Sequence, residues 1–164
     1  MNDFKTALLQ EMESYFDGDL KRIEHARKVT EYAEKLLEQE EGNYEVVIGA
    51  SVLHDIGIHE AERKHGSNSG KYQEIEGPPI ASKILTKLGF EAGQIDEICD
   101  IIGHHHSPSK ITTRNFGILY DADWLVNLKD EYNIQDKNKL SHIIEKVFLT
   151  ESGKTLAKEI YLHP

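Results

Sequence analysis

Apolar residues along the chain recur mostly every three or four positions, which is the spacing of one face of an α-helix. The clearest stripe follows Asp19, a suitable N-cap, and predicts a helix to about residue 41 with inward positions at Ile23, Ala26, Val29, Ala33, Leu36 and Leu37. A mostly buried helix is expected over 44–56, and Gly57 is well placed to end it. Further helices are expected over 3–16, 91–105, 113–130, 136–150 and 151–161.

Residues 59–77 interrupt this pattern because they are polar and show little periodicity. A connection of this length in a compact domain is often a lid or a binding loop, so we expect a mobile loop here. Pro78 and Pro79 suit the first turn of the next helix, which would run to about Leu88. No linker or repeat divides the chain, so residues 1–164 predict one all-α domain.

Composition narrows the range of partners. The formal net charge is −10, from 19 basic and 29 acidic residues, which argues against a broad nucleic-acid surface and against an anionic membrane surface. The single cysteine, Cys99, rules out an intramolecular disulfide and fits a reducing, cytoplasmic compartment. No apolar run approaches the roughly 20 residues that a membrane span needs.

Four segments place histidine or aspartate at the edge of an apolar helix face: IEHARKV, VLHDIG, IIGHHHSP and LYDADWL. Each has an ordinary explanation by itself. A lone histidine is often structural, a His–Asp pair is often an ion pair or a cap, and a run of histidines is often a solvated turn. Imidazole nitrogens and carboxylate oxygens are also the usual ligands of divalent ions such as zinc, manganese and iron. The joint occurrence of the four segments in an all-α chain favours a metal site.

Taken together, RIEHARKVTEYAEKLL, HDIG after an apolar run, and YDADWL resemble the HD-domain superfamily of metal-dependent phosphohydrolases over roughly residues 20–130. The resemblance implies an HD-domain-like helical bundle. It also implies a divalent ion (Mn, Fe, Ni, Co, Zn or Mg) held by His25, His54, Asp55 and Asp123. Asp121 points about 200° away from Asp123 on a helix, so it is expected to support the site indirectly or to cap a neighbouring helix.

Some members of this family hold a second ion through a histidine pair and a further histidine. His104 and His105 match the pair, but the further histidine is missing, and Glu76 or Glu74 is the most plausible substitute. We therefore expect one tightly held ion, with a weaker second site or a phosphate contact at His104 and His105. The chain reads HDIGI rather than HDIGK and has no GYP element, which argues against the cyclic-di-GMP phosphodiesterase branch.

The resemblance implies hydrolysis of a phosphate ester, such as a nucleotide or a similar small phosphorylated molecule, by metal-activated water. Asp55 could accept the proton of that water. Lys64, Lys71 and Arg114 are candidate contacts for the anionic substrate, although each could equally be a solvated surface cation. Two other functions stay open, a di-iron oxygenase and a ligand-sensing module without turnover. For the oligomeric state, the candidate is a homodimer.

Overall fold

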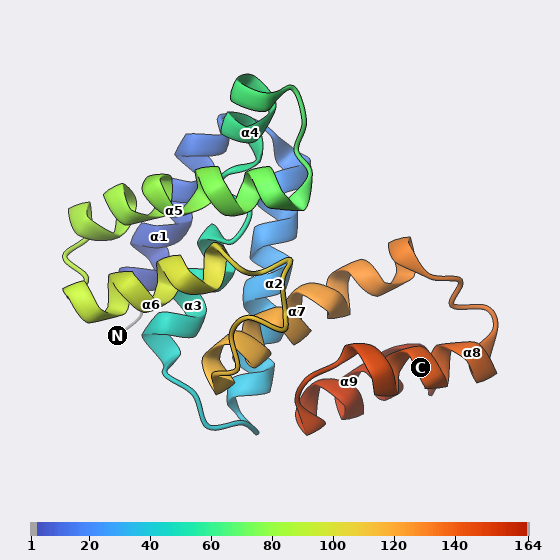
Figure 1. Ribbon diagram of the computed structural model, residues 1–164. Coiled ribbons are helices and arrows are strands. Elements are labelled where there is room, and N and C mark those ends of the chain that lie inside the picture. The colour runs from blue at the N-terminus through green and yellow to red at the C-terminus, as the bar shows by residue number, and fades with distance from the viewer. Residues whose placement is uncertain (1–2, 164) are drawn as a thin grey trace.

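The computed structural model describes residues 3–163, and within that range it contains nine helices and no strand. The expected all-α architecture is therefore confirmed (Figure 1). The helices are α1 (Asp3–Phe16), α2 (Leu20–Leu37), α3 (Tyr44–Leu53), α4 (Ile58–His65), α5 (Gly70–Lys87), α6 (Ala92–Ile102), α7 (Arg114–Glu131), α8 (Lys137–Val147) and α9 (Glu151–Tyr161).

Local capping explains where several helices begin. The Asp19 carboxylate accepts a hydrogen bond from the backbone N–H of Arg22 and caps α2, as the sequence predicted. Asn43 caps α3 through the N–H of Val46 in the same way. Helix α2 ends at Leu37 instead of continuing to about residue 41, because residues 38–41 offer no apolar side chain to bury.

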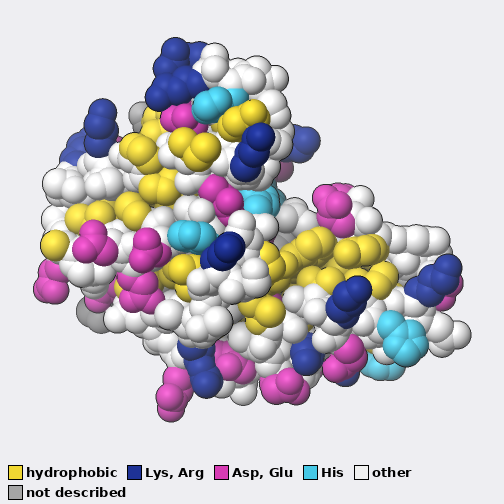
Figure 2. Space-filling model, viewed as in Figure 1, with side chains coloured by type: hydrophobic (Ala, Val, Ile, Leu, Met, Phe, Trp, Pro, Cys, Tyr) yellow, Lys and Arg dark blue, Asp and Glu magenta, His cyan; other side chains and the backbone are white. Residues whose placement is uncertain are grey.

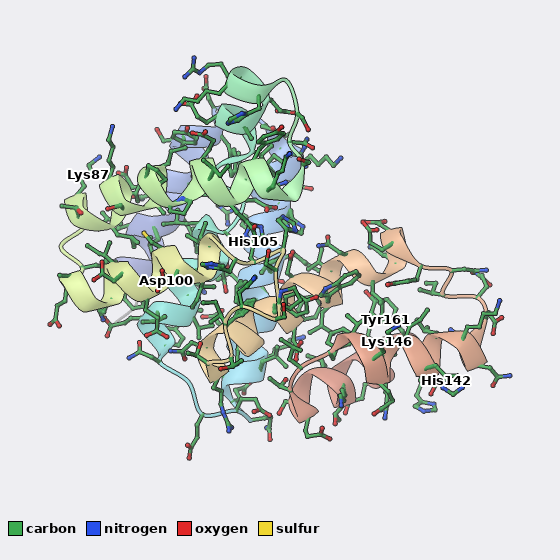
Figure 3. All side chains as sticks on the ribbon, viewed as in Figure 1. Lys87, Asp100, His105, His142, Lys146 and Tyr161 are labelled. Atoms are coloured by element: carbon green, nitrogen blue, oxygen red, sulfur yellow. The ribbon has the colours of Figure 1, made fainter. Side chains whose placement is uncertain are left out.

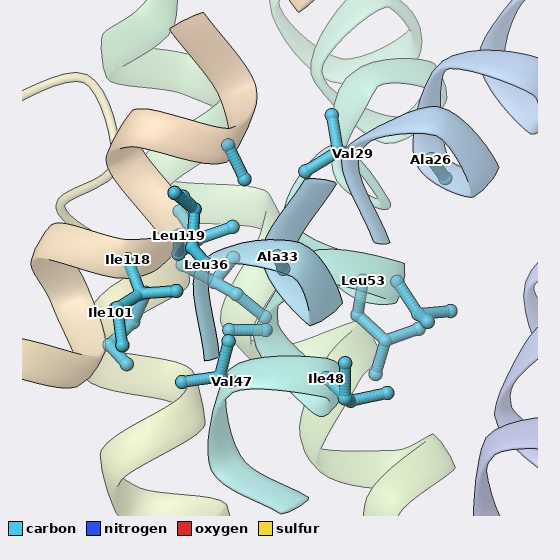
Figure 4. Close-up of a cluster of buried hydrophobic side chains, with 14 of the residues drawn as sticks. Ala26, Val29, Ala33, Leu36, Val47, Ile48, Leu53, Ile101, Ile118 and Leu119 are labelled. Carbon is cyan, nitrogen blue, oxygen red and sulfur yellow. The ribbon is translucent and has the colours of Figure 1, made fainter. Parts of the chain in front are cut away.

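The core forms where α2, α3, α6 and α7 meet (Figure 4). The predicted stripe of α2 faces inward, and α3 is buried on every side from Val46 to Leu53. Helix α3 therefore runs through the middle of the molecule, so side chains at its C-terminal end lie among other helices rather than in solvent. That end carries the HD sequence.

The expectation of a loop over residues 59–77 is wrong. This stretch forms α4 and the first half of α5, with only residues 66–69 between the two helices. Gly57 precedes α4 instead of ending α3, and the backbones of Gly57 and Gly77 approach so closely that a Cβ on Gly57 would lie 2.6 Å from the Gly77 nitrogen. This tertiary contact compensates for the weak local periodicity.

Pro78 and Pro79 lie inside α5 rather than at its start, which corrects a second expectation. Proline disfavours helical backbone in the residue before it partly through contact with that residue's Cβ. The residue before Pro78 is Gly77, which has no Cβ, so this part of the clash is absent. The helix therefore continues through the Gly-Pro-Pro sequence.

The last two helices form a hairpin at the right of Figure 1, and α9 packs along α7. The Tyr161 hydroxyl donates a hydrogen bond to the Leu125 carbonyl, and the Lys137 ammonium donates one to the Tyr161 carbonyl. Helix α8 ends at Val147, three residues earlier than expected. Within residues 3–163, no helix has both the length and the apolar composition required to cross a bilayer.

Candidate metal centre

Four side chains from three parts of the fold converge at the centre of the molecule. His25 projects from α2, His54 and Asp55 follow the end of α3, and Asp123 projects from α7. The His25 Nε2 atom lies 3.0 Å from Asp123 Oδ1, 3.2 Å from His54 Nε2 and 3.4 Å from Asp55 Oδ2. The structure thus brings together the four residues that the sequence proposed as one ligand set.

The orientation of His54 shows what this cluster can bind. Its Nδ1–H donates to the Ser51 carbonyl at 2.8 Å, so the neutral ring has a lone pair at Nε2. That nitrogen faces Asp123 Oδ1 at 3.3 Å and Asp55 Oδ2 at 3.4 Å, and the ring is completely buried. Several acceptors therefore point at one another, and a divalent cation among them would satisfy all of them.

The electrostatics of the cluster also favour a cation. Burial opposes charge on the His54 ring, but Asp55 and Asp123 outweigh it and hold the pKa of His54 well above its usual value. Burial likewise opposes ionisation of Asp55, while His54 and His105 lower the pKa of that carboxyl well below its usual range. The raised pKa of His54 and the lowered pKa of Asp55 both describe a site that keeps its negative charge and attracts positive charge.

A second cluster lies on the other side of Asp55 and contains His105 and His106. His105 Nδ1–H donates to the Ile102 carbonyl at 2.7 Å, which leaves the lone pair on Nε2. This Nε2 is buried without a hydrogen-bond partner and lies 3.4 Å from Asp55 Oδ1. The two oxygens of Asp55 therefore face two separate groups of histidines, which is the arrangement of a carboxylate that can bridge two ions.

The histidine pair at this site is His105 and His106, one residue later than the sequence suggested. Helix α6 ends at Ile102, and the following turn directs His105 inward. Figure 3 shows His105 among the packed helices. His104 is partly exposed and donates from Nδ1 to the Asp100 carbonyl at 2.8 Å, and it belongs to neither cluster.

Glu76 does not replace the missing histidine. Its carboxylate accepts hydrogen bonds from Lys64 at 3.1 Å and from His65 at 2.8 Å, so it links α4 to α5. Glu74 accepts hydrogen bonds from the backbone N–H of His106 and the hydroxyl of Ser107, and thereby holds the segment that carries the histidine pair.

Gln73 is the residue of this stretch that reaches the site. Its amide nitrogen donates to the Asn68 carbonyl at 2.6 Å, so its amide oxygen faces His106 Nε2 at 3.0 Å. That oxygen can only accept, so His106 carries its proton on Nε2 and keeps the lone pair on Nδ1. Gln73 thus sets the tautomer of His106.

Asp121 has the capping role that was one of its two expected roles. The buried carboxylate accepts hydrogen bonds from the N–H groups of Leu149 and Thr150 and from the Thr150 hydroxyl, at 2.7 to 2.9 Å. Burial raises the pKa of Asp121 to about 6 although these donors favour its ionised form. A Cβ on Gly153 would overlap this carboxylate, so glycine is required there.

A cleft of about 1070 Å³ opens beside the first cluster, and His25, Asp55, His106 and Asp123 lie in its wall. None of the three cations expected at the substrate lines it. Lys64 pairs with Glu76, Lys71 lies over the Tyr72 ring, and Arg114 lies 3.3 Å from Glu40.

The cations that do line the cleft are Lys21, Arg22, Lys28 and Lys129. The position of three of these cations could have been inferred from helical spacing, although not from residue type alone. Lys21, Arg22 and Lys28 lie four residues before, three before and three after His25, so they share its face of α2. Once His25 is placed in the site, helical spacing identifies its cationic neighbours.

Comparison with known proteins agrees with this geometry. The family model of the HD domain matches residues 22–128, a range that contains all the residues of both clusters. A crystal structure of a predicted HD superfamily hydrolase from an uncultured Thermotogales bacterium is similar to this chain with a TM-score of 0.68 and 27% sequence identity. The similarity covers 94% of this chain and 83% of that one. The search of curated proteins gave no match. With more than half of its length matched by the family model, and with the His and His–Asp residues of that family clustered in its core, the chain belongs to the HD domain family.

Proposed function

We propose that this protein is a metal-dependent phosphohydrolase that acts on a small phosphorylated molecule. The observation that carries the proposal is the placement of two histidine lone pairs, on His54 and His105, against the two oxygens of Asp55. Membership of the HD family and the similarity to an HD superfamily hydrolase support hydrolysis at the level of the family.

The protein's own groups suit this chemistry. A bound divalent ion would lower the pKa of a water molecule and neutralise charge on a phosphoryl oxygen. Asp55 lies between the clusters and accepts the proton of the attacking water. The water oxygen then bonds to phosphorus, the ester P–O bond breaks, and the leaving alcohol takes the proton from Asp55, which becomes ionised again. Asn127 donates a hydrogen bond to Asp123 Oδ1 at 3.0 Å and so fixes that carboxylate.

The two clusters differ in the number of groups that they offer. His25, His54, Asp55 and Asp123 form the larger one, whereas Asp55, His105 and His106 form the smaller. We therefore infer one tightly held ion at the larger cluster and a weaker second ion at the smaller one. An ion at the smaller cluster would have fewer protein ligands, so it would be the one better placed to bind a substrate phosphate.

The proposal is tested by stripping the purified protein of metal and reloading it with Mn, Fe, Ni, Co, Zn or Mg separately. Released phosphate is then measured on a panel of nucleotides and sugar phosphates. We expect turnover with at least one of these ions. The His54→Ala variant should lose both the bound metal and the turnover. His142→Ala is the matched control because His142 is exposed on α8, far from the site (Figure 3).

Two outcomes would contradict the proposal. Metal binding without phosphate release from any member of the panel would favour the sensing module. Oxygen consumption that occurs with iron and not with manganese or nickel would favour the oxygenase, because histidine and carboxylate ligands also suit iron.

A further inference from the structure

We propose that the cleft binds substrates that carry a second phosphate group, and that Arg22 and Lys28 recognise that group. The inference rests on the proposed hydrolysis and names the class of substrate at the same site. It starts from the side chains that α2 presents to the cleft. Lys21 and Arg22 lie one turn before His25, and Lys28 lies one turn after it. One turn advances about 5.4 Å, so cations flank the metal cluster on both sides along the helix.

These cations are available to an anion. Within residues 3–163, no carboxylate lies within ion-pair distance of Lys21, Arg22, Lys28 or Lys129. Lys64 and Arg114, outside the cleft, both have acidic partners. The Lys28 ammonium lies over the Tyr32 ring, 5.9 Å from its centre, and this contact positions it without neutralising it.

Once an ion is bound, the balance of charge in the cleft favours an anionic ligand. A divalent ion would offset Asp55 and Asp123, leaving four cations against the rim carboxylates Glu24, Asp130 and Glu131. This excess of positive charge lies in a chain whose formal charge is −10. On the face that Figure 2 shows, Lys and Arg side chains gather at the top, over α4, and are otherwise dispersed among acidic ones. The cations of the cleft therefore form a local site for an anion.

A phosphate bound at the ion alone would leave these cations without a partner. Arg22 is partly buried, so its guanidinium benefits from a bound oxyanion more than a fully solvated lysine would. Beyond them the cleft is lined by Tyr32, Val126 and Tyr161, which offer apolar surface to the organic part of a substrate. A molecule with two phosphates and an organic group matches all three parts of the cleft.

The test compares adenosine 5′-monophosphate with adenosine 5′-diphosphate and with adenosine 3′,5′-bisphosphate. Wild-type protein should show at least about a tenfold higher kcat/KM for one of the two-phosphate substrates than for the monophosphate, which is the effect of one charge-assisted hydrogen bond. Whichever of the two is preferred tells whether the second phosphate is adjacent or separate. In Arg22→Gln and Lys28→Gln this preference should fall towards one, mainly through KM.

Lys83→Gln is the matched control, because Lys83 is an exposed lysine of α5 outside the cleft. Metal content and melting temperature, measured on every variant, report whether the fold and the first cluster are intact. Equal kcat/KM for all three substrates in wild type, or an equal preference in the Arg22, Lys28 and Lys83 variants, would overturn the inference.

A second measurement separates this inference from the proposed function. Pyrophosphate and inorganic phosphate are titrated calorimetrically into metal-loaded protein, without turnover. Pyrophosphate should bind at least about tenfold more tightly, and Arg22→Gln should remove the difference. If no substrate is hydrolysed and this difference is still found, the proposed hydrolysis fails and the cleft inference stands. Equal affinity for the two anions overturns the inference, whatever the activity.

Discussion

His104 and His105 are identical neighbours with different surroundings. His104 is partly exposed and bonded to its own helix, whereas His105 is 2% exposed, with an unpartnered nitrogen beside Asp55. Replacing His105 with alanine should therefore abolish the second ion and most of the turnover. His104→Ala should retain both, which makes it the matched control. Metal stoichiometry by elemental analysis and kcat on the two variants decide the matter; similar losses in both would contradict the assignment of His105 as the inward histidine.

Gln73 gives a second prediction at this scale. It occupies the side of the smaller cluster and orients His106 through a hydrogen bond. Gln73→Ala should weaken the second ion by about 10-fold or more, the usual cost of losing a group that orients a ligand. Calorimetric titration of the second equivalent of metal measures this, and nitrogen chemical shifts of His106 in the metal-free protein report its tautomer.

Gln73→His is the informative counterpart, since an imidazole at this position could itself become a ligand. The second ion should then bind more tightly than in wild type. Weaker binding in both variants would show that residue 73 orients His106 and cannot serve as a ligand, whereas unchanged binding in both would remove Gln73 from the site.

The choice among three consecutive histidines shows the limit of the sequence at the residue scale. HHH contains no difference between its members, and the inward pair depends on the residue at which α6 ends. A helix end is uncertain by one or two positions in any sequence-based prediction. The residues of the larger cluster had distinct neighbours, so they could be named individually. The cations of the cleft required knowledge of which face of α2 points inward.

At the scale of elements, the contact between α4 and α5 depends on two glycines. A Cβ on Gly57 would meet backbone atoms of Gly77 and Gln73, which cannot move independently. Gly57→Ala should therefore lower the free energy of unfolding by about 1–3 kcal/mol. Gly93→Ala, in α6, is the control because a Cβ there would meet nothing within 4 Å, and it should be neutral or stabilising by up to about 1 kcal/mol. Urea denaturation of the two variants makes the comparison.

The same contact explains why the sequence pattern of residues 59–77 predicts a loop although the stretch is mostly helical. Its helices are short or polar, and only Ile58 and Ala61 of α4 are buried. A close approach of two backbones leaves no periodic apolar signal, because glycine marks it rather than a large side chain. The long, striped α2 and α7 could be predicted from local pattern, whereas α4 depends on a partner 20 residues away in the sequence.

The junction of α7 with α9 makes a further prediction at this scale. Asp121→Ala would leave the donors at Leu149 and Thr150 without their acceptor, and should cost about 1–3 kcal/mol of stability. The first metal should still bind, because Asp123 faces a different side of the helix. Loss of metal together with stability would instead show that α9 helps to hold Asp123 in place.

At the scale of the whole molecule, the metal-binding groups join α2, α3 and α7, so ion binding and folding should be linked. Removing the ion with a chelator should lower the melting temperature, and adding it back at 100 times its Kd should restore about 2.7 kcal/mol. The raised pKa of His54 means that a proton competes with the ion, so affinity should fall as pH falls. Calorimetric scans with and without metal at two pH values test both points. His25→Ala, which lacks one contributing group, should show a much smaller response.

The walls of the cleft come from different parts of the chain, and this affects how the substrate preference of the protein could be changed. Every residue of both metal clusters lies between positions 25 and 123, whereas Tyr161, in the far wall, comes from α9 (Figure 3). The hairpin of α8 and α9 is held by hydrogen bonds to α7 and by core side chains such as Leu140, Ile144 and Ala157, and among the described residues it supplies no member of either metal cluster. The organic part of a substrate would therefore meet a side chain from a stretch of the chain that supplies no residue to either metal cluster. Substitutions at Tyr161 are thus a route to a changed substrate preference that leaves every proposed metal ligand in place.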